Sequence, residues 1–113
     1  MLKNINWNGI GFRVKNEINQ EQLQDYRERF KSFIREAGGV TSICHASGIS
    51  QGSIKGIYGN KDRLPSPILV VRLIDSLKGS VPKKFNREYL RPDVTPIQWG
   101  RLDDKIKKLK RSR

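Results

Sequence analysis

Cysteine and histidine are scarce in this chain of 113 residues, with one of each. A single cysteine cannot form an intramolecular disulfide, and no group of Cys and His residues has the spacing of a metal site. The chain also lacks clustered carboxylates and a phosphate-cradling loop of the kind that many enzymes use. We therefore expect no metal ion, no cofactor, no catalytic residue and no enzymatic activity, and a place in the reducing cytosol.

Long apolar runs are missing as well. Hydrophobic residues make up 35% of the chain, and no run approaches the ~20 residues that a membrane span needs. The first residues show no apolar core of a signal peptide. We expect one compact domain with extensions and no membrane segment.

Acidic side chains are also few. The chain has 11 Asp and Glu and 23 Lys and Arg, which gives a net charge of +12. The excess lies in residues 40–93, with nine basic and four acidic side chains, and in residues 101–113, with seven basic and two acidic ones. An excess of this size points to a polyanion, either nucleic acid or an acidic membrane surface.

A first helix is predicted from residue 20 to the glycines at 38 and 39. Asn19 can cap it, and Gln22 stands at the capping-box position. Apolar residues at helical spacing form one stripe: Leu23, Tyr26, Phe30, Phe33, Ile34 and Ala37. The opposite, polar face is expected to carry Arg27, Glu28, Lys31 and Arg35.

Two shorter helices are predicted over 40–47 and 50–58. Gly48 between them tolerates a positive φ at a sharp turn, and Ile49 is expected to be buried directly after it. Cys44 supplies the small residue that a steep crossing of the two helices needs. Two short helices joined in this way form the helix-turn-helix pattern.

The second of these helices has two different faces. Ser50 can cap it, and Ile54 and Ile57 are three residues apart and are predicted to face the core. The other positions carry short or polar residues, which leaves that face free to enter a major groove.

The rest of the chain divides into a helical part and two ends. We expect a helix after the Ser66-Pro67 cap, with a β-strand as the competing interpretation of its β-branched residues. A short helix follows at 86–90, and a basic amphipathic segment begins at Trp99. We divide the chain into an N-terminal arm (1–18), a DNA-binding domain (19–93) and a basic C-terminal extension (94–113).

The two ends leave several interpretations open. Ile10, Phe12 and Val14 alternate with other residues, which indicates a short strand, in an arm that is either packed on the domain or disordered. The C-terminal extension could be a DNA-contacting arm, a dimer helix or a solvated tail.

The run from Gly38 to Asp93 resembles the YdaS/Cro-like helix-turn-helix family of phage and prophage transcriptional regulators. The resemblance rests on Gly38-Gly39, on Gly48-Ile49-Ser50-Gln51, on Tyr58-Gly59-Asn60 with the Pro65 loop, and on Tyr89-Leu90-Arg91-Pro92-Asp93. It implies an all-α bundle of four to five helices of the lambda-repressor/Cro-like type. It also implies a Cro-like repressor in the cytoplasm and on the nucleoid, of prophage origin, with an antitoxin-like role as a further implication. We expect the Arg-Pro-Asp element to close the domain through an ion pair and a rigid turn.

Residues on the outer face of 50–58 and around it are predicted to contact double-stranded DNA. Gln51 can bond an adenine edge with its amide, and Lys55 can meet a guanine edge or a phosphate. Tyr58 is either part of the core or a backbone contact. The predicted set is Thr41, Ser50, Gln51, Gly52, Ser53, Lys55, Tyr58, Asn60, Lys61 and Arg63.

Function leaves alternatives too. A single helix-turn-helix reads few base pairs, so the interpretation as a regulator implies a homodimer. The first alternative is an antitoxin-like module that binds a toxin protein through its arm or tail. The second is an RNA-binding or nuclease-accessory protein. Cys44 and His45 are interpreted as structural, because adjacent helical residues point in different directions.

Overall fold

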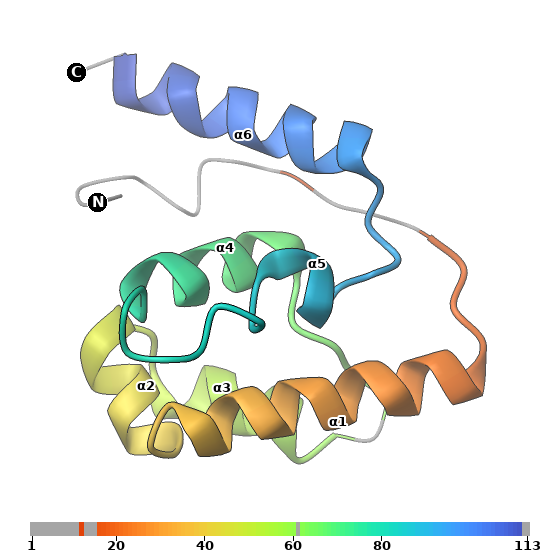
Figure 1. The fold of residues 1–113 in the computed structure, drawn as a ribbon, viewed down its shortest axis with the longest axis vertical. Helices are drawn as coiled ribbons and strands as arrows, with labels where there is room; N and C mark the ends of the chain where they lie inside the picture. Colours follow the sequence, from red (N-terminus) through yellow and green to blue (C-terminus); the bar gives the residue numbers. More distant parts are fainter. Residues whose placement is uncertain (1–11, 13–15, 61, 112–113) are drawn as a thin grey trace.

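The fold is known from a computed structural model, which describes residues 12, 16–60 and 62–111. All regular structure in these residues is helical, so the all-α prediction is confirmed there (Figure 1). The helices are α1 (Gln20–Glu36), α2 (Val40–Ser47), α3 (Gln51–Tyr58), α4 (Pro67–Ser76), α5 (Arg87–Leu90) and α6 (Pro96–Arg111). Six helices in the described residues exceed the four to five that we expected, since the C-terminal segment is helical.

Helix α1 begins and ends as its sequence predicts. The Asn19 side chain accepts a hydrogen bond from the Gln22 backbone at 2.8 Å, and the Gln22 side chain accepts one from the Asn19 backbone at 3.0 Å. This reciprocal pair satisfies two free N–H groups at the helix start. At the other end Gly38 and Gly39 have φ values of 94° and 101°, which an L side chain rarely adopts, and they turn the chain into α2.

Arg27 is not on the polar face of α1, so that expectation is wrong. Its side chain is buried, and its guanidinium donates hydrogen bonds to the carbonyl oxygens of Ile57 at 3.0 Å, Tyr58 at 3.1 Å and Arg63 at 2.7 Å. Carbonyls at the end of α3 have no partner inside that helix, and its partial negative charge favours a cation. The guanidinium therefore joins α1 to the end of α3.

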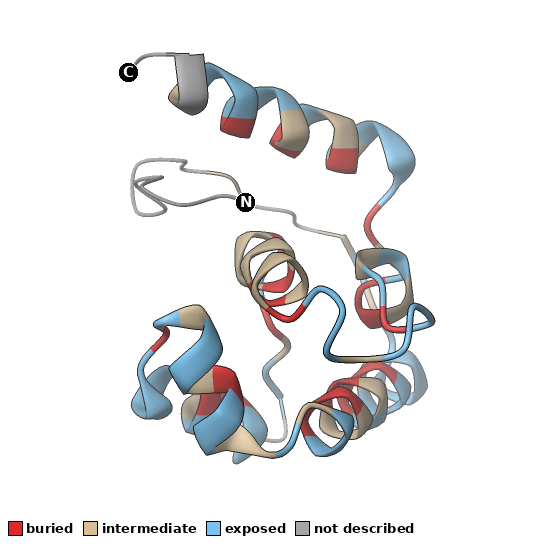
Figure 2. Ribbon diagram, turned by 60° about the vertical axis from the view of Figure 1, so that its left-hand side comes forward, coloured by how far each residue is buried: buried red, intermediate tan, exposed pale blue. Residues whose placement is uncertain are grey.

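The hydrophobic core lies where α1 to α5 meet, and buried residues line the inner sides of these helices (Figure 2). Phe33, Ile43, Ile54, Leu73 and Leu90 have no exposed surface. They come from five different helices, so the burial of each depends on the docking of the others.

Helix α4 follows its cap signals, and the competing strand interpretation is wrong. The Ser66 hydroxyl accepts a hydrogen bond from the Leu69 backbone at 3.2 Å, and Pro67 occupies the first turn.

The loop after α5 confirms the expected ion pair. Arg91 donates two bonds to the Asp93 carboxylate at 2.8 and 2.7 Å and a third to the Pro65 carbonyl at 2.7 Å.

The C-terminal helix belongs to the same hydrophobic cluster as the other helices. Trp99, Leu102 and Ile106 are buried on one side of α6. Arg87 of α5 donates two bonds to the Asp103 carboxylate at 2.7 and 2.9 Å, and this hydrogen bonding raises the pKa of Arg87 against the opposing effect of its partial burial. The ionised pair fastens α6 to α5, so residues 96–106 are not a solvated tail.

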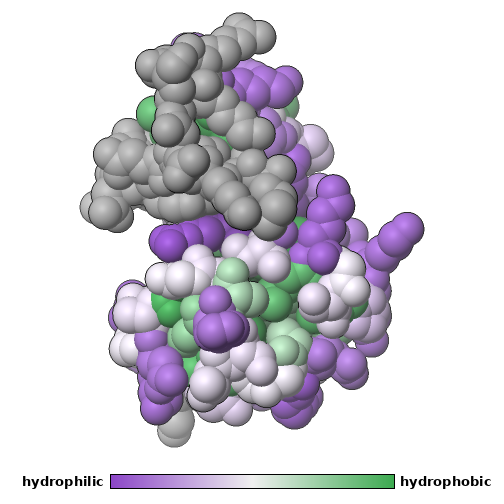
Figure 3. Space-filling view, turned by 90° about the vertical axis from the view of Figure 1, so that its left-hand side faces the viewer, coloured by the Kyte–Doolittle hydropathy of each residue, from purple (hydrophilic) through white to green (hydrophobic). Residues whose placement is uncertain are grey.

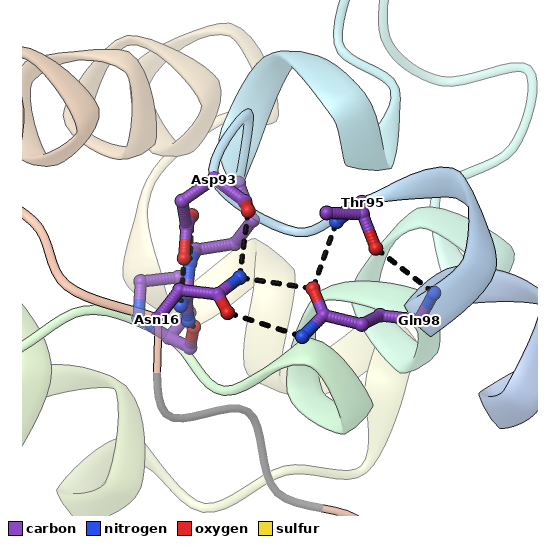
Figure 4. Close-up of polar contacts among 6 residues, drawn as sticks. Asn16, Asp93, Thr95 and Gln98 are labelled. Carbon is purple, nitrogen blue, oxygen red and sulfur yellow. Dashed lines mark hydrogen bonds and ion pairs between the residues drawn. The ribbon is translucent and has the colours of Figure 1, made fainter.

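Asn16 provides a second attachment of α6 (Figure 4). Its amide and that of Gln98 exchange hydrogen bonds at 2.9 and 3.1 Å, and Asn16 also donates to the Asp93 carbonyl at 2.7 Å. Gln98 and Thr95 form a capping box at the start of α6. The end of the expected arm is thus bound to the domain, whereas Ile10 and Val14 of the expected strand lie outside the described residues. Phe12 is half-buried and has no regular structure.

Within the described ranges, no helix combines the length and the apolar character that crossing a bilayer requires.

Candidate nucleic-acid interface

Three residues, Gly48, Ile49 and Ser50, join α2 to α3 in a tight turn. Gly48 has a φ of 75°, and its N–H bonds the Cys44 carbonyl at 2.9 Å to close α2. Ile49 is buried, as predicted. The Ser47 hydroxyl donates to the Ile43 carbonyl at 2.7 Å and accepts from the Ile49 N–H at 3.2 Å, so the turn is held at both ends.

Helix α3 has the orientation that its sequence predicts. The Ser50 side chain caps it by accepting a bond from the Ser53 N–H at 3.2 Å. Ile54 and Ile57 are 0% and 4% exposed and pack into the core. With about 100° of rotation per residue, the side opposite these two isoleucines carries Gly52, Lys55 and Gly56.

Nine of the predicted contact residues are exposed, and we call the surface of α3 and of the residues next to it in the chain the α3 face. The exposed members are Thr41, Ser50, Gln51, Gly52, Ser53, Lys55, Tyr58, Asn60 and Arg63. Lys61 lies outside the described residues. Tyr58 is 39% exposed, so it belongs to this surface and not to the core. The Lys31 ammonium lies 5.8 Å from the centre of the Tyr58 ring and adds a cation at the edge of the surface.

The two glycines of α3 have no role inside the protein that would require them. A Cβ on Gly52 would meet nothing within 4 Å, and one on Gly56 would meet only the Arg63 guanidinium at 3.5 Å, an ordinary contact. Neither has a positive φ. Glycine in a helix interior costs about 1 kcal/mol relative to alanine. What the glycines provide is an outer surface on which another molecule can approach the α3 backbone closely.

A polar hollow of about 560 Å³ lies beside the start of α3. Ser50, Ser53, Arg63 and Ser66 contribute to its lining, and the first turns of both α3 and α4 border it. Helix N-termini and an arginine together favour an anionic group such as a phosphate. At the N-terminus of α2, Gly39 provides no side-chain cap and Thr41 is exposed.

Sequence reasoning missed two arginines that support this surface. Arg27 holds the end of α3, as described above. Arg72 of α4 donates to the Ser47 carbonyl at 3.3 Å and so holds the end of α2. The sequence contained a signal that Arg27 is buried, because positions 27, 30 and 34 fall on one helical stripe. The charge of Arg27 instead favoured the polar face of the helix.

The remaining candidates for chemistry stay apart. Cys44, which we interpreted as a small structural contact, is half-buried, and His45 is exposed. In the part of the chain that the structure describes, no three His, Cys, Asp or Glu side chains are grouped as a metal site would need. Comparison of the chain with protein-family models, with curated proteins and with solved structures finds no match.

Proposed function

We propose that this protein is a sequence-specific, double-stranded DNA-binding transcriptional regulator of the helix-turn-helix class, and that it acts by binding alone. The observation that carries the proposal is the division of α3 into two sides. Ile54 and Ile57 anchor one side in the core, while Gln51 and Lys55 stand exposed on the remainder. A short helix with one side packed in the core and small or polar residues on its exposed side can fit the major groove of B-DNA.

Base recognition is assigned to the start of α3. Gln51 is its first residue, and the first residues of a recognition helix are those that reach base edges. The Gln51 amide can donate and accept toward one adenine, while Lys55, one turn later, meets a guanine edge or a phosphate. Gly52 and Gly56 let the helix backbone come close to the bases.

Phosphate contacts surround this centre. Arg63 and Ser53 border the polar hollow beside α3, and Thr41 stands at the uncapped start of α2. Asn60 is exposed in the loop after α3, and we assign a phosphate contact to Lys61 from its sequence position alone. A net charge of +12 supplies the long-range attraction to DNA that such contacts need.

The proposed mode of action follows the YdaS/Cro-like resemblance. A homodimer places two α3 helices in successive major grooves of a two-fold site, with centres about 34–36 Å apart. Occupancy of such an operator on the nucleoid represses or redirects transcription.

Selection of bound duplexes from a random library, repeated over a range of salt concentrations, tests the proposal. We expect one enriched motif that is still preferred at physiological salt. Gln51→Ala should change the motif at one position, whereas Gln20→Ala, the same substitution at the first position of α1, should leave it unchanged. Binding without any preferred sequence, or a motif that is indifferent to Gln51→Ala, would refute the assignment.

A further inference from the structure

A second hollow, distinct from the α3 face, lies between the end of α4 and the loop that returns to α5. It holds about 340 Å³. We call it the 71–87 hollow, and its apolar lining comprises Val71, Ile74, Val81, Pro82 and Phe85. It opens near the carboxyl end of α4, on a side of the molecule where apolar side chains reach the surface among hydrophilic ones (Figure 3).

Aromatic packing fixes the floor of this hollow. Phe85 is 3% exposed and meets the rings of Phe33 at 5.8 Å and Tyr89 at 5.4 Å, both edge-to-face. Gly79, with a φ of 87°, sets the turn that brings the loop back. The apolar lining is therefore preformed, and binding there requires little rearrangement.

The rim of the hollow is cationic. Lys78 and Lys83 are exposed, line the opening and form no ion pair with any residue that the structure describes. Arg87 also lines it, but Asp103 and Glu88 engage its guanidinium. Asp75 is the acidic group of the lining and has an interaction of its own. The rim thus offers two ammonium groups that no described residue engages in an ion pair, beside an apolar floor.

The hollow and the α3 face lie on different sides of α4. The polar hollow beside α3 uses the start of α4, through Ser66 and Leu69, while the 71–87 hollow uses its end, through Val71 and Ile74. Figure 2 shows α2 and α3 on one side of α4 and the returning loop on the other. The two hollows therefore have no lining residue in common.

We propose that the 71–87 hollow binds an acidic amphipathic segment of a partner protein. Apolar side chains at helical spacing enter the hollow, as in other helix-in-groove complexes, and carboxylates on the flanks pair with Lys78 and Lys83. Complementary charge at the rim selects this partner, because carboxylates can pair with the two lysines that line the opening. The proposal does not depend on DNA binding at α3.

The test uses the full chain and a labelled helical peptide of about 12 residues, with leucines on one face and glutamates elsewhere. A second peptide replaces every glutamate with lysine. The variant Lys78→Glu/Lys83→Glu removes the cationic rim. Arg101→Glu/Lys107→Glu, at exposed positions on α6 outside the hollow, changes the net charge by the same amount. Fluorescence anisotropy gives the affinities of the peptides. A third variant, Val81→Asp, places a charge in the apolar lining of the hollow.

We expect the wild type to bind the acidic peptide and not the lysine peptide. The rim variant should bind it about 10-fold more weakly than the α6 control does, because two attractive charge pairs at the rim become repulsive. Equal losses in the rim variant and the control would overturn the proposal, since attraction would then follow net charge alone. Two other outcomes would also overturn the proposal, because each identifies a different occupant of the hollow. One is binding of octanoate, a small amphipathic acid, in place of the peptide. The other is self-association of the chain that Val81→Asp abolishes.

The same variants separate this proposal from the previous one. Gln51→Ala should leave peptide affinity unchanged, and the rim variant should keep the DNA motif that the wild type selects. Loss of peptide binding in Gln51→Ala would contradict the independence of the two surfaces.

Discussion

The two glycines on the outer surface of α3 give the sharpest prediction. Alanine at position 52 or 56 should stabilise the free protein, because alanine limits the unfolded chain and favours the helix. The gain is about 1 kcal/mol for Gly56, inside α3, and less for Gly52 in its first turn. For a domain of this size, 1 kcal/mol corresponds to a rise in Tm of about 4 °C.

The same substitutions should weaken DNA binding. Each adds a methyl group to the surface that we place against the bases, and a misfit of that size costs about 1–3 kcal/mol, which corresponds to roughly 5- to 150-fold in affinity. Gly100→Ala is the matched control, since Gly100 lies inside α6 and its Cβ would also meet nothing within 4 Å. It should raise Tm without affecting DNA binding.

Thermal unfolding and titration of the selected duplex measure both effects. A higher Tm with unchanged affinity for Gly52→Ala and Gly56→Ala would refute a close approach of DNA to α3. A lower Tm would show that the fold itself needs the glycines, against the open space around them.

Three further predictions follow from named contacts. Lys55→Ala should make the negative slope of log affinity against log salt shallower by about 1, measured by titration at several salt concentrations. An unchanged slope would exclude a phosphate contact. Arg27→Met should destabilise the protein by about 2–4 kcal/mol in denaturant unfolding, because three carbonyls lose a buried donor, and should speed amide exchange at the end of α3; a loss below about 0.5 kcal/mol, the range of ordinary surface substitutions, would show that these bonds contribute little. Asn16→Ala and Gln98→Ala should each cost about 1 kcal/mol and be non-additive in a double-mutant cycle, whereas full additivity would mean that the two amides do not act as a pair.

Local signals were enough to predict much of the fold. The capping box of Asn19, the positive φ of Gly48 and the cap of Ser50 each depend on a few neighbouring residues, so the sequence contains all that they require. The buried side of α3 also follows from the spacing of Ile54 and Ile57. The exposed side of α3 follows from the same spacing, because it consists of the residues opposite the two isoleucines.

Long-range contacts were beyond the sequence. Arg27 finds its partners some 30 residues further along the chain, and an arginine on an apolar stripe gives no sign that carbonyls will meet it there. Helix α6 was readable as amphipathic, but its attachment depends on Arg87 and Asn16, which are distant in sequence from Asp103 and Gln98. Tyr58 was undecided between core and surface, because one residue at the end of a helix can turn either way.

The most direct measurement of the central claim is the change in backbone amide NMR shifts when the selected duplex is added to this 13.0 kDa protein. We predict that the largest changes fall on Thr41 and on the α3 residues from Gln51 to Tyr58, with small changes at Ile74 and Val81. Changes confined to α6 or to the 71–87 hollow, with α3 unaffected, would contradict the placement of DNA at the α3 face.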